Sequence, residues 1–242
     1  MNIIVINGSP SLKKGMTYQL ISNFIKGCES AGATVEQIDL QTMKPKFCLG
    51  CMHCFYSKDH LCVHKDGMAE VHQKILKADY MVMATPVYAD GVSGQMKTFM
   101  DRFVPLIDVR FEIVYGHYRH IKLHEKLPKV ALLSVAGFYE MDNFDAVEEH
   151  VKKFTLHIQS EFVGSVLRPS SYILGMDQIF TDDVKKIKEG IVRAGAELVK
   201  NGAFSQDTLD QVSNTPIDKE MWLLGSNKFH EKCLEAGKFL PL

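Results

Sequence analysis

Short apolar segments rich in β-branched residues alternate with segments of helical periodicity along most of this 242-residue chain. Apolar runs of this kind are typical of strands buried on both faces of a parallel sheet. Strands that alternate with helices are typical of βαβ units. The sequence therefore predicts an α/β fold with a doubly wound, five-stranded parallel sheet of order 2-1-3-4-5 and helices on both faces. The predicted strands are residues 3–6, 34–38, 80–84, 130–135 and 162–167.

The segments between these strands divide into predicted helices and two excursions from the core. Residues 45–63 carry four cysteines and follow neither periodicity, and residues 108–128 are polar and rich in aromatic residues. We expect the second excursion to be a lid or a subunit contact rather than a plain surface hairpin. The chain should form one domain over residues 1–203, followed by a C-terminal arm over 204–242. One helix is predicted from residue 16, with Gly27 weakening its end and Gly32 stopping it. The others are predicted at residues 66–76, 96–103, 144–159 and 182–200, and the third helix should place Met96, Phe99, Met100 and Phe103 inward.

Charge and hydropathy exclude several classes of partner. The chain has 28 basic and 29 acidic residues without a basic stripe, which disfavours nucleic acid. No apolar run approaches the roughly 18 residues of a membrane span. The first residues read as a strand rather than a signal peptide. We therefore expect a cytoplasmic protein that binds neither nucleic acid nor a membrane.

The first predicted strand leads into a loop of small and hydroxyl residues that ends where a helix begins. Backbone amides can approach an anion closely in such a loop, and the helix start adds free amides and its dipole. Lys13 or Lys14 would supply charge. An ordinary strand-to-helix turn has the same composition. The loop matches neither G-x-x-x-x-G-K-[ST] nor G-x-G-x-x-G, which disfavours a P-loop or dinucleotide site. The candidate anion-binding residues are Ser9, Pro10, Ser11, Gly15, Met16 and Thr17.

A second loop follows the third predicted strand, which should lie beside the first. Pro86 stiffens the turn, Tyr88 can lie near a flat ring, and the amides of residues 87–89 can bind its carbonyl edge. The alternative is that Tyr88 is a surface aromatic next to a helix start. The two loops together predict a site for a ring that carries a phosphate. The candidate residues of this loop are Pro86, Val87, Tyr88, Ala89 and Asp90.

Three segments together, residues 7–10, 85–88 and 96–102, resemble the NADPH-dependent FMN reductase family of flavodoxin-like proteins. The resemblance covers roughly residues 1–175. It implies that the first loop binds the phosphate of FMN and that the second lines the isoalloxazine ring. It also implies a third contact, at Gly137 and Phe138. Relatives often have Asn or Ser where this chain has Met16, so a contact there is expected through the backbone amide.

Cys48, Cys51, Cys54 and Cys62 lie close together in the 45–63 segment. In a reducing compartment such spacing indicates metal ligation or redox chemistry rather than a disulfide framework. Iron–sulfur ligation is the first interpretation. Redox thiols and a zinc site are the alternatives. The cysteine motif is also similar to that of the iron–sulfur flavoproteins, a branch of the same family, which implies a [4Fe-4S] cluster.

The predicted function is FMN-dependent oxidoreduction, in which flavin N5 rather than a protein side chain carries the chemistry. Electrons would come from NAD(P)H or a ferredoxin-type carrier. They would pass to a small-molecule acceptor such as a flavin or quinone. The alternatives are a flavin electron carrier or redox sensor without turnover, and a zinc-stabilised binding module. A homodimer or homotetramer is expected.

Overall fold

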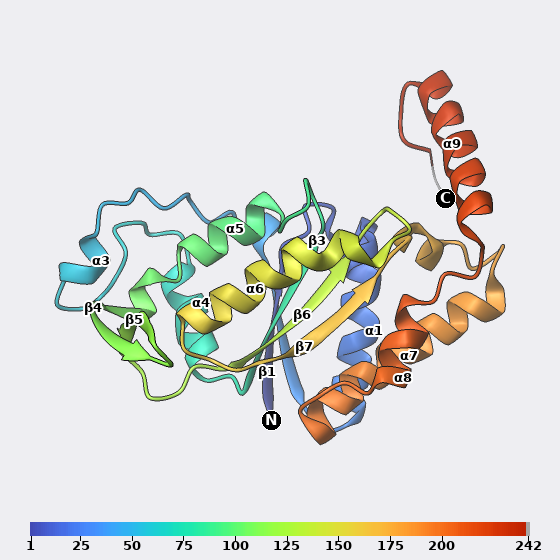
Figure 1. Cartoon of the computed structure of the whole chain (residues 1–242). Coiled ribbons are helices and arrows are strands. Elements are labelled where there is room, and N and C mark those ends of the chain that lie inside the picture. Colours follow the sequence, from blue (N-terminus) through green and yellow to red (C-terminus); the bar gives the residue numbers. More distant parts are fainter. Residues whose placement is uncertain (241–242) are drawn as a thin grey trace.

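Five parallel strands form the centre of the computed structural model, which describes residues 1–240 (Figure 1). Their order in the sheet is β2-β1-β3-β6-β7, which confirms the predicted flavodoxin-like topology. The strands β1, β3 and β6 at the centre are almost wholly buried, as their β-branched sequences predict. The strands are β1 (Asn2–Asn7), β2 (Thr34–Asp39), β3 (Tyr80–Pro86), β6 (Lys129–Val135) and β7 (Phe162–Arg168).

One face of the sheet is covered by α1 (Met16–Ser30) and α7 (Thr181–Asn201), which pack against each other. Two glycines allow this close approach. A Cβ on Gly27 would lie 1.9 Å from the Val192 carbonyl oxygen, and one on Gly195 would lie 2.1 Å from that of Phe24. The sequence pattern treats Gly27 as a weak point near the helix end, whereas in the structure it is a contact point between helices.

The other face is covered by α4 (Met68–Leu76), α5 (Gly94–Asp101) and α6 (Asp145–His157). The predicted inward residues of α5 are buried against the sheet. Asp66, expected to begin α4, precedes its cap position, which Gly67 occupies in a left-handed conformation. Two short helical pieces were not predicted, α2 (Leu40–Met43) and the single turn α3 (His53–Tyr56) within the cysteine segment.

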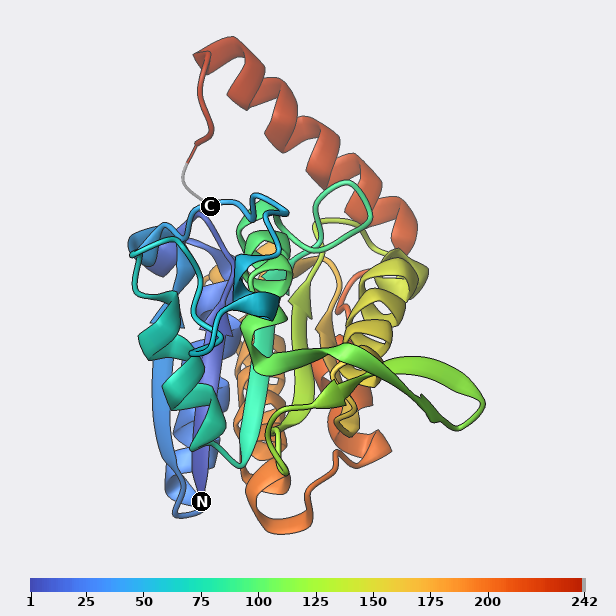
Figure 2. The same cartoon turned by 90° about the vertical axis from the view of Figure 1, so that its left-hand side faces the viewer.

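The 108–128 excursion is an antiparallel hairpin of β4 (Ile107–Val114) and β5 (His117–Lys122). It extends from the sheet on the side where α3 lies (Figures 1 and 2). The His120 ring lies 5.3 Å from the Phe55 ring of α3 and 5.6 Å from the His157 ring of α6. The hairpin therefore packs against the cysteine segment. Its role as a lid or subunit contact stays a prediction.

Residues 204–240 form two helices that the sequence pattern did not indicate. The first, α8 (Gln206–Ser213), packs against α7 and β7 and buries Thr208 and Val212. The second, α9 (Lys219–Ala236), buries none of its side chains and projects from the carboxyl end of the sheet (Figures 1 and 2). The domain boundary at residue 203 stays a prediction. In residues 1–240, no helix is long and apolar enough to cross a membrane.

Candidate functional site

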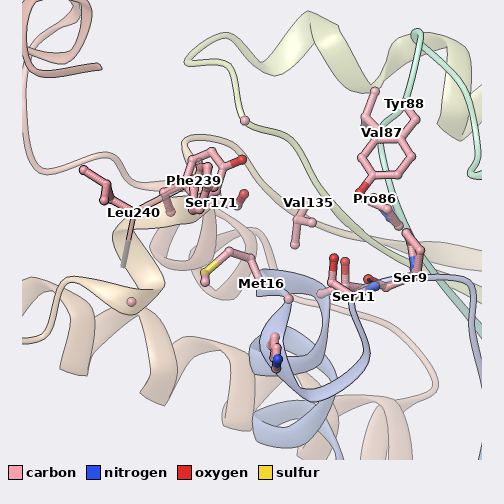
Figure 3. A pocket seen from close by; sticks show the side chains of 17 residues that line it. Ser9, Ser11, Met16, Pro86, Val87, Tyr88, Val135, Ser171, Phe239 and Leu240 are labelled. Atoms are coloured by element: carbon pink, nitrogen blue, oxygen red, sulfur yellow. Dashed lines mark hydrogen bonds between the residues drawn. The ribbon is translucent and has the colours of Figure 1, made fainter. Parts of the chain in front are cut away.

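A cavity of about 1010 Å³ opens at the carboxyl ends of β1, β3 and β6. This is the edge at which doubly wound sheets bind ligands. Figure 3 shows Ser9, Ser11 and residues 86–88 on one side of the cavity, with Phe239, Leu240 and Ser171 on the other. The lining residues are Ser9, Pro10, Ser11, Lys14, Gly15, Met16, Thr17, Pro86, Val87, Tyr88, Val135, Gly137, Ser171, Tyr172, Gly175, Phe239 and Leu240.

The first loop is held by a chain of short-range hydrogen bonds that begins at the end of β1. The Ser9 amide donates to Asn7 Oδ1 over 3.0 Å, and the Ser11 amide donates to Ser9 Oγ over 3.3 Å. Asn7 is itself fixed, because its Nδ2 donates to Asp39 Oδ1 over 2.8 Å. These bonds hold the small residues of the loop against the cavity before any ligand binds.

The amino-terminal end of α1 forms the floor of this part of the cavity. Its cap residue is Gly15, which offers no side-chain oxygen to the first helical amides. The first amides of a helix have no acceptor within the helix, so those of Met16 and Thr17 can bind an anion. Lys14 adds a positive charge to the lining. The geometry therefore fits a phosphate group better than a neutral ligand.

The second loop is held by hydrogen bonds to β6, to the end of its own strand β3 and to the first loop. The Val87 amide donates to the Val135 carbonyl over 2.9 Å, and the Ser93 amide donates to Thr85 Oγ1 over 3.0 Å. Ser93 Oγ also donates to the Gly8 carbonyl over 2.6 Å, which joins the second loop to the first. The two loops are therefore connected to each other by a hydrogen bond through Ser93. Val87 and Tyr88 lie above the anion-binding part of the cavity (Figure 3).

Most residues predicted for the site come together here. All six candidates of the first loop line the cavity, together with Pro86, Val87, Tyr88 and Gly137. The side chains of Ala89, Asp90 and Phe138 lie outside the lining. Ala89 and Asp90 are at the tip of a tight turn closed by hydrogen bonds between Tyr88 and Gly91, and both have left-handed backbone. Phe138 is 62% exposed on the outer side of its loop.

Sequence reasoning missed the wall opposite Tyr88. Tyr172 comes from a short 3-10 helix, Ser171–Gly175, which the Ser171 amide anchors by donating to the Ala136 carbonyl over 2.9 Å. Burial raises the pKa of Tyr172, and the nearby Tyr88 raises it further. The Phe239 ring lies 5.9 Å from that of Tyr172. No local signal in the sequence connects residues 171–175 or 239–240 with the two loops.

The four clustered cysteines lie outside this cavity. The Cys48 and Cys51 residues are exposed, Cys54 and Cys62 are half-buried, and all four are free thiols. Burial raises the pKa of Cys54, and the Cys62, Cys48 and Cys51 thiols raise it further. In the described residues, no three His, Cys, Asp or Glu side chains form a group that could hold a metal ion. The donor types fit a soft metal or an iron–sulfur cluster.

Residues 1–159 match the sequence model of the NADPH-dependent FMN reductase family. Among curated proteins, the chain is similar to an iron-sulfur flavoprotein of Methanocaldococcus jannaschii. The two are 37% identical over 102 residues, which is 42% of this chain and 50% of that protein. It is also similar to an iron-sulfur flavoprotein of Archaeoglobus fulgidus, at 33% identity over 122 residues, which is 50% of each chain. The matches thus span about half the length of these relatives.

Solved structures with a similar fold include an FMN-dependent NADH-azoreductase from Bacillus anthracis in complex with FMN. The TM-score is 0.62 at 15% identity, covering 82% of this chain and 99% of that one. An NAD(P)H:quinone oxidoreductase from Methanothermobacter marburgensis has a TM-score of 0.60 at 17% identity, covering 82% and 96%. At these identities the likeness shows the fold alone.

Proposed function

The chain belongs to the NADPH-dependent FMN reductase family, and we propose that it is an oxidoreductase that holds FMN in the cavity at the carboxyl end of the sheet. One observation carries the proposal. The two loops that the sequence singled out line a single cavity, with a helix amino-terminus at one end and an aromatic side chain at the other.

The residues divide into two groups by chemistry. The hydroxyl groups of Ser9, Ser11 and Thr17, with the first amides of α1, would bind the phosphate. Pro86 to Tyr88 and Gly137 would lie along the ring, and Tyr172 and Phe239 would exclude water from its other side. When bound, FMN supplies the hydride-accepting N5 and can transfer one or two electrons. The protein residues would hold the flavin in place and set the polarity around its ring.

The electron donor would be NAD(P)H or a ferredoxin-type carrier, and the acceptor a small molecule such as a flavin or quinone. Two solved structures of similar fold are named NADH-azoreductase and NAD(P)H:quinone oxidoreductase, so NAD(P)H and a quinone are the first donor and acceptor to test. The size of the cavity, about 1010 Å³, also supports it, because it would leave room for a flat acceptor beside a bound flavin.

Cys48, Cys51, Cys54 and Cys62 would hold a [4Fe-4S] cluster. Support comes from the names of the curated relatives, from the free state of the thiols and from Gly50, whose left-handed backbone turns the chain between the first two cysteines. Zinc or unligated redox thiols are the competing assignments.

A second candidate is an electron carrier or sensor without turnover. The exposure of Cys48 and Cys51 favours it, because redox groups at a surface exchange electrons readily with a partner protein.

Anaerobic purification, followed by a visible spectrum and by iron, sulfide and zinc analysis, tests these assignments. We expect bound FMN, iron and acid-labile sulfide, and oxidation of NADPH or NADH in the presence of a quinone. Protein that is folded but fails to bind added FMN would overturn the flavin site. Stoichiometric zinc without sulfide would overturn the cluster. Flavin that only dithionite or ferredoxin reduces would favour the carrier.

A further inference from the structure

A second cavity, of about 620 Å³, lies beside the one proposed for FMN. It is lined mainly by α9 on one side and by residues 170–180 of the body on the other. The two cavities share Tyr172 and Gly175 as lining residues, so they adjoin each other at the 3-10 helix that contains both. A ligand in the second cavity would therefore lie next to a ligand in the first.

The arm contacts the body near both ends of α9. At the start of the helix the Trp222 ring lies 6.2 Å from that of Tyr139. Beyond its end the Phe239 ring lies 5.9 Å from that of Tyr172. The second cavity lies along the helix between these contacts, which hold its two walls together.

The lining of the second cavity is largely apolar and aromatic. Trp222 and Phe229 come from α9, and Phe180 comes from the opposite wall. Among the described residues, no lysine or arginine lines this cavity, and its one carboxylate, that of Asp177, already pairs with Lys188 over 2.6 Å. A phosphate group would find no cation here. The cavity therefore suits an uncharged, apolar ligand better than NAD(P)H.

One buried hydroxyl in the lining has no partner. Ser170 is 1% exposed, and its Oγ makes no hydrogen bond within the described residues. Its backbone is left-handed, with a φ of 45°, which is uncommon for a residue other than glycine. Both features cost free energy, and such costs are typical of binding sites. Ser170 directly precedes Ser171, which lines the FMN cavity, so the unpartnered hydroxyl belongs to a residue at the boundary.

Gly225, within α9, also lines the second cavity. Glycine inside a helix is destabilising relative to alanine. Close packing requires Gly27 and Gly195, but it does not require Gly225, because a Cβ there would meet nothing within 4 Å. We therefore attribute this glycine to the space that it leaves for a ligand.

We propose that the second cavity binds the apolar side chain of an extended quinone acceptor whose reducible ring lies at the flavin. The inference rests on the function proposed above. In such a quinone, a carbonyl oxygen lies beside the ring carbon that bears the side chain. A hydroxyl donor at the boundary, with an apolar cavity beyond it, matches that arrangement. With NAD(P)H as donor, the quinone becomes a quinol by taking two electrons and one proton from NAD(P)H and one proton from water.

The test compares two quinones and two variants. Menadione is a naphthoquinone without a long side chain, and the second quinone is the same ring with a geranyl chain. FMN-loaded wild type should have a kcat/KM about tenfold higher for the geranylated quinone, mainly through KM, because the chain buries apolar surface. Gly225→Phe fills the cavity and should abolish this preference. Asn227→Phe adds the same side chain to an exposed position of α9 outside the lining, and it should keep the preference.

The fluorescence of Trp222 measures binding independently of turnover. Trp222 is the single tryptophan of the chain, and it lines the second cavity. Without NAD(P)H, the geranylated quinone should quench this fluorescence at a concentration about tenfold lower than menadione does. The difference should disappear in Gly225→Phe and persist in Asn227→Phe.

Each failure has a different meaning. Equal kcat/KM values for the two quinones in wild type would overturn the side-chain site and leave the flavin function standing. A preference that Gly225→Phe retains would overturn the assignment of the site to this cavity. Protein that fails to bind FMN, or that oxidises NAD(P)H with neither quinone, would overturn the proposed function instead. The Trp222 titration of that protein would then decide whether the cavity binds the geranyl chain.

Discussion

Gly15 stands where the first loop turns into α1, and its lack of a side chain brings two serines close to the helix start. A Cβ at this position would lie 2.9 Å from Ser11 Cβ and 3.2 Å from Ser9 Oγ. Both serines belong to the proposed phosphate site. Any side chain here must therefore displace the groups that would bind the anion.

We predict that Gly15→Ala raises the Kd for FMN about tenfold, which is a loss of about 1.4 kcal/mol. Quenching of flavin fluorescence measures the Kd. The control is Gly94→Ala in the first turn of α5, where a Cβ would meet nothing within 4 Å. It should bind FMN as wild type does. Equal affinity in the Gly15→Ala variant would contradict the assignment of this loop.

His72 predicts a pH dependence of stability. Burial lowers its pKa to about 4, and the nearby Arg102 cation adds to this against the opposing Asp66 carboxylate. Since the folded pKa is below the unfolded value, the unfolded chain binds protons more readily. This contribution is complete above about pH 6.5 and is lost as the pH falls toward 4.

We expect the His72 contribution to the free energy of unfolding to fall by about 2 kcal/mol between pH 7 and pH 5. Urea unfolding at both pH values measures it. His72→Leu should flatten the difference, whereas His117→Gln, on the exposed hairpin, should not. A wild-type pH dependence in His72→Leu would show that His72 does not carry the effect.

The first loop and Tyr88 could be predicted because their signal is local. Each lies within a few residues of a strand end, and the topology brings those strand ends together. Tyr172 and Phe239 could not be predicted in this way. They reach the cavity through the path of a 3-10 helix and of a long arm. The hydrogen bonds from Arg102 Nη1 to Lys46 and Asp66 could not be predicted either, since these partners are 36 or more residues away in sequence.

Helix α5 depends on the serine that caps its amino-terminal end. Ser93 Oγ accepts from the Met96 amide over 3.2 Å and donates to the Gly8 carbonyl over 2.6 Å. We predict that Ser93→Ala destabilises the protein by about 1–2 kcal/mol and also weakens FMN binding severalfold. Chemical denaturation and fluorescence titration measure the two effects.

Ser205→Ala is the matched control for this cap. Ser205 caps α8 by accepting from the Thr208 amide, and it does not line the cavity. Its loss should cost stability without changing the affinity for FMN. If both variants bind FMN equally well, the cap of α5 does not hold the first loop in its binding shape.

Periodicity in the sequence predicted the five strands and the main helices, because each helix buries one stripe of apolar residues and each strand buries one apolar run. Periodicity did not predict the contact between α1 and α7. Glycine weakens a helix in propensity scales, whereas here glycines are required for the two helices to approach each other closely. The helices α8 and α9 were missed for a different reason. The α8 sequence is largely polar, and α9 buries none of its side chains although it contains several apolar residues.

Helix α9 exposes a set of large apolar side chains to solvent. They are Met221, Leu223, Leu224 and Leu234. Contact with the body near the start of the arm is limited, with the Trp222 ring 6.2 Å from that of Tyr139 and an ion pair between Lys219 and Glu140. We expect these apolar residues to contact a second copy of the chain.

Truncation after Ile217 should therefore lower the mass measured by light scattering while the unfolding midpoint changes little. The cut spares α8, whose Thr208 and Val212 are buried in the body. The double variant Leu223→Ser, Leu224→Ser should reproduce the lower mass with the arm still present. An unchanged mass in both proteins would exclude the arm as a subunit contact.

The two ends of the described chain suit different labels, because one end lies away from the cavity and the other lies at it. Met1 lies directly before β1, at the end of the sheet opposite the cavity, whereas Leu240 lines the cavity itself. An affinity tag at the amino terminus should leave ligand exchange undisturbed. A small fluorescent amino acid incorporated in place of Leu240, by contrast, would lie at the mouth of the cavity. Its emission would report occupancy directly, without relying on the colour of the bound group.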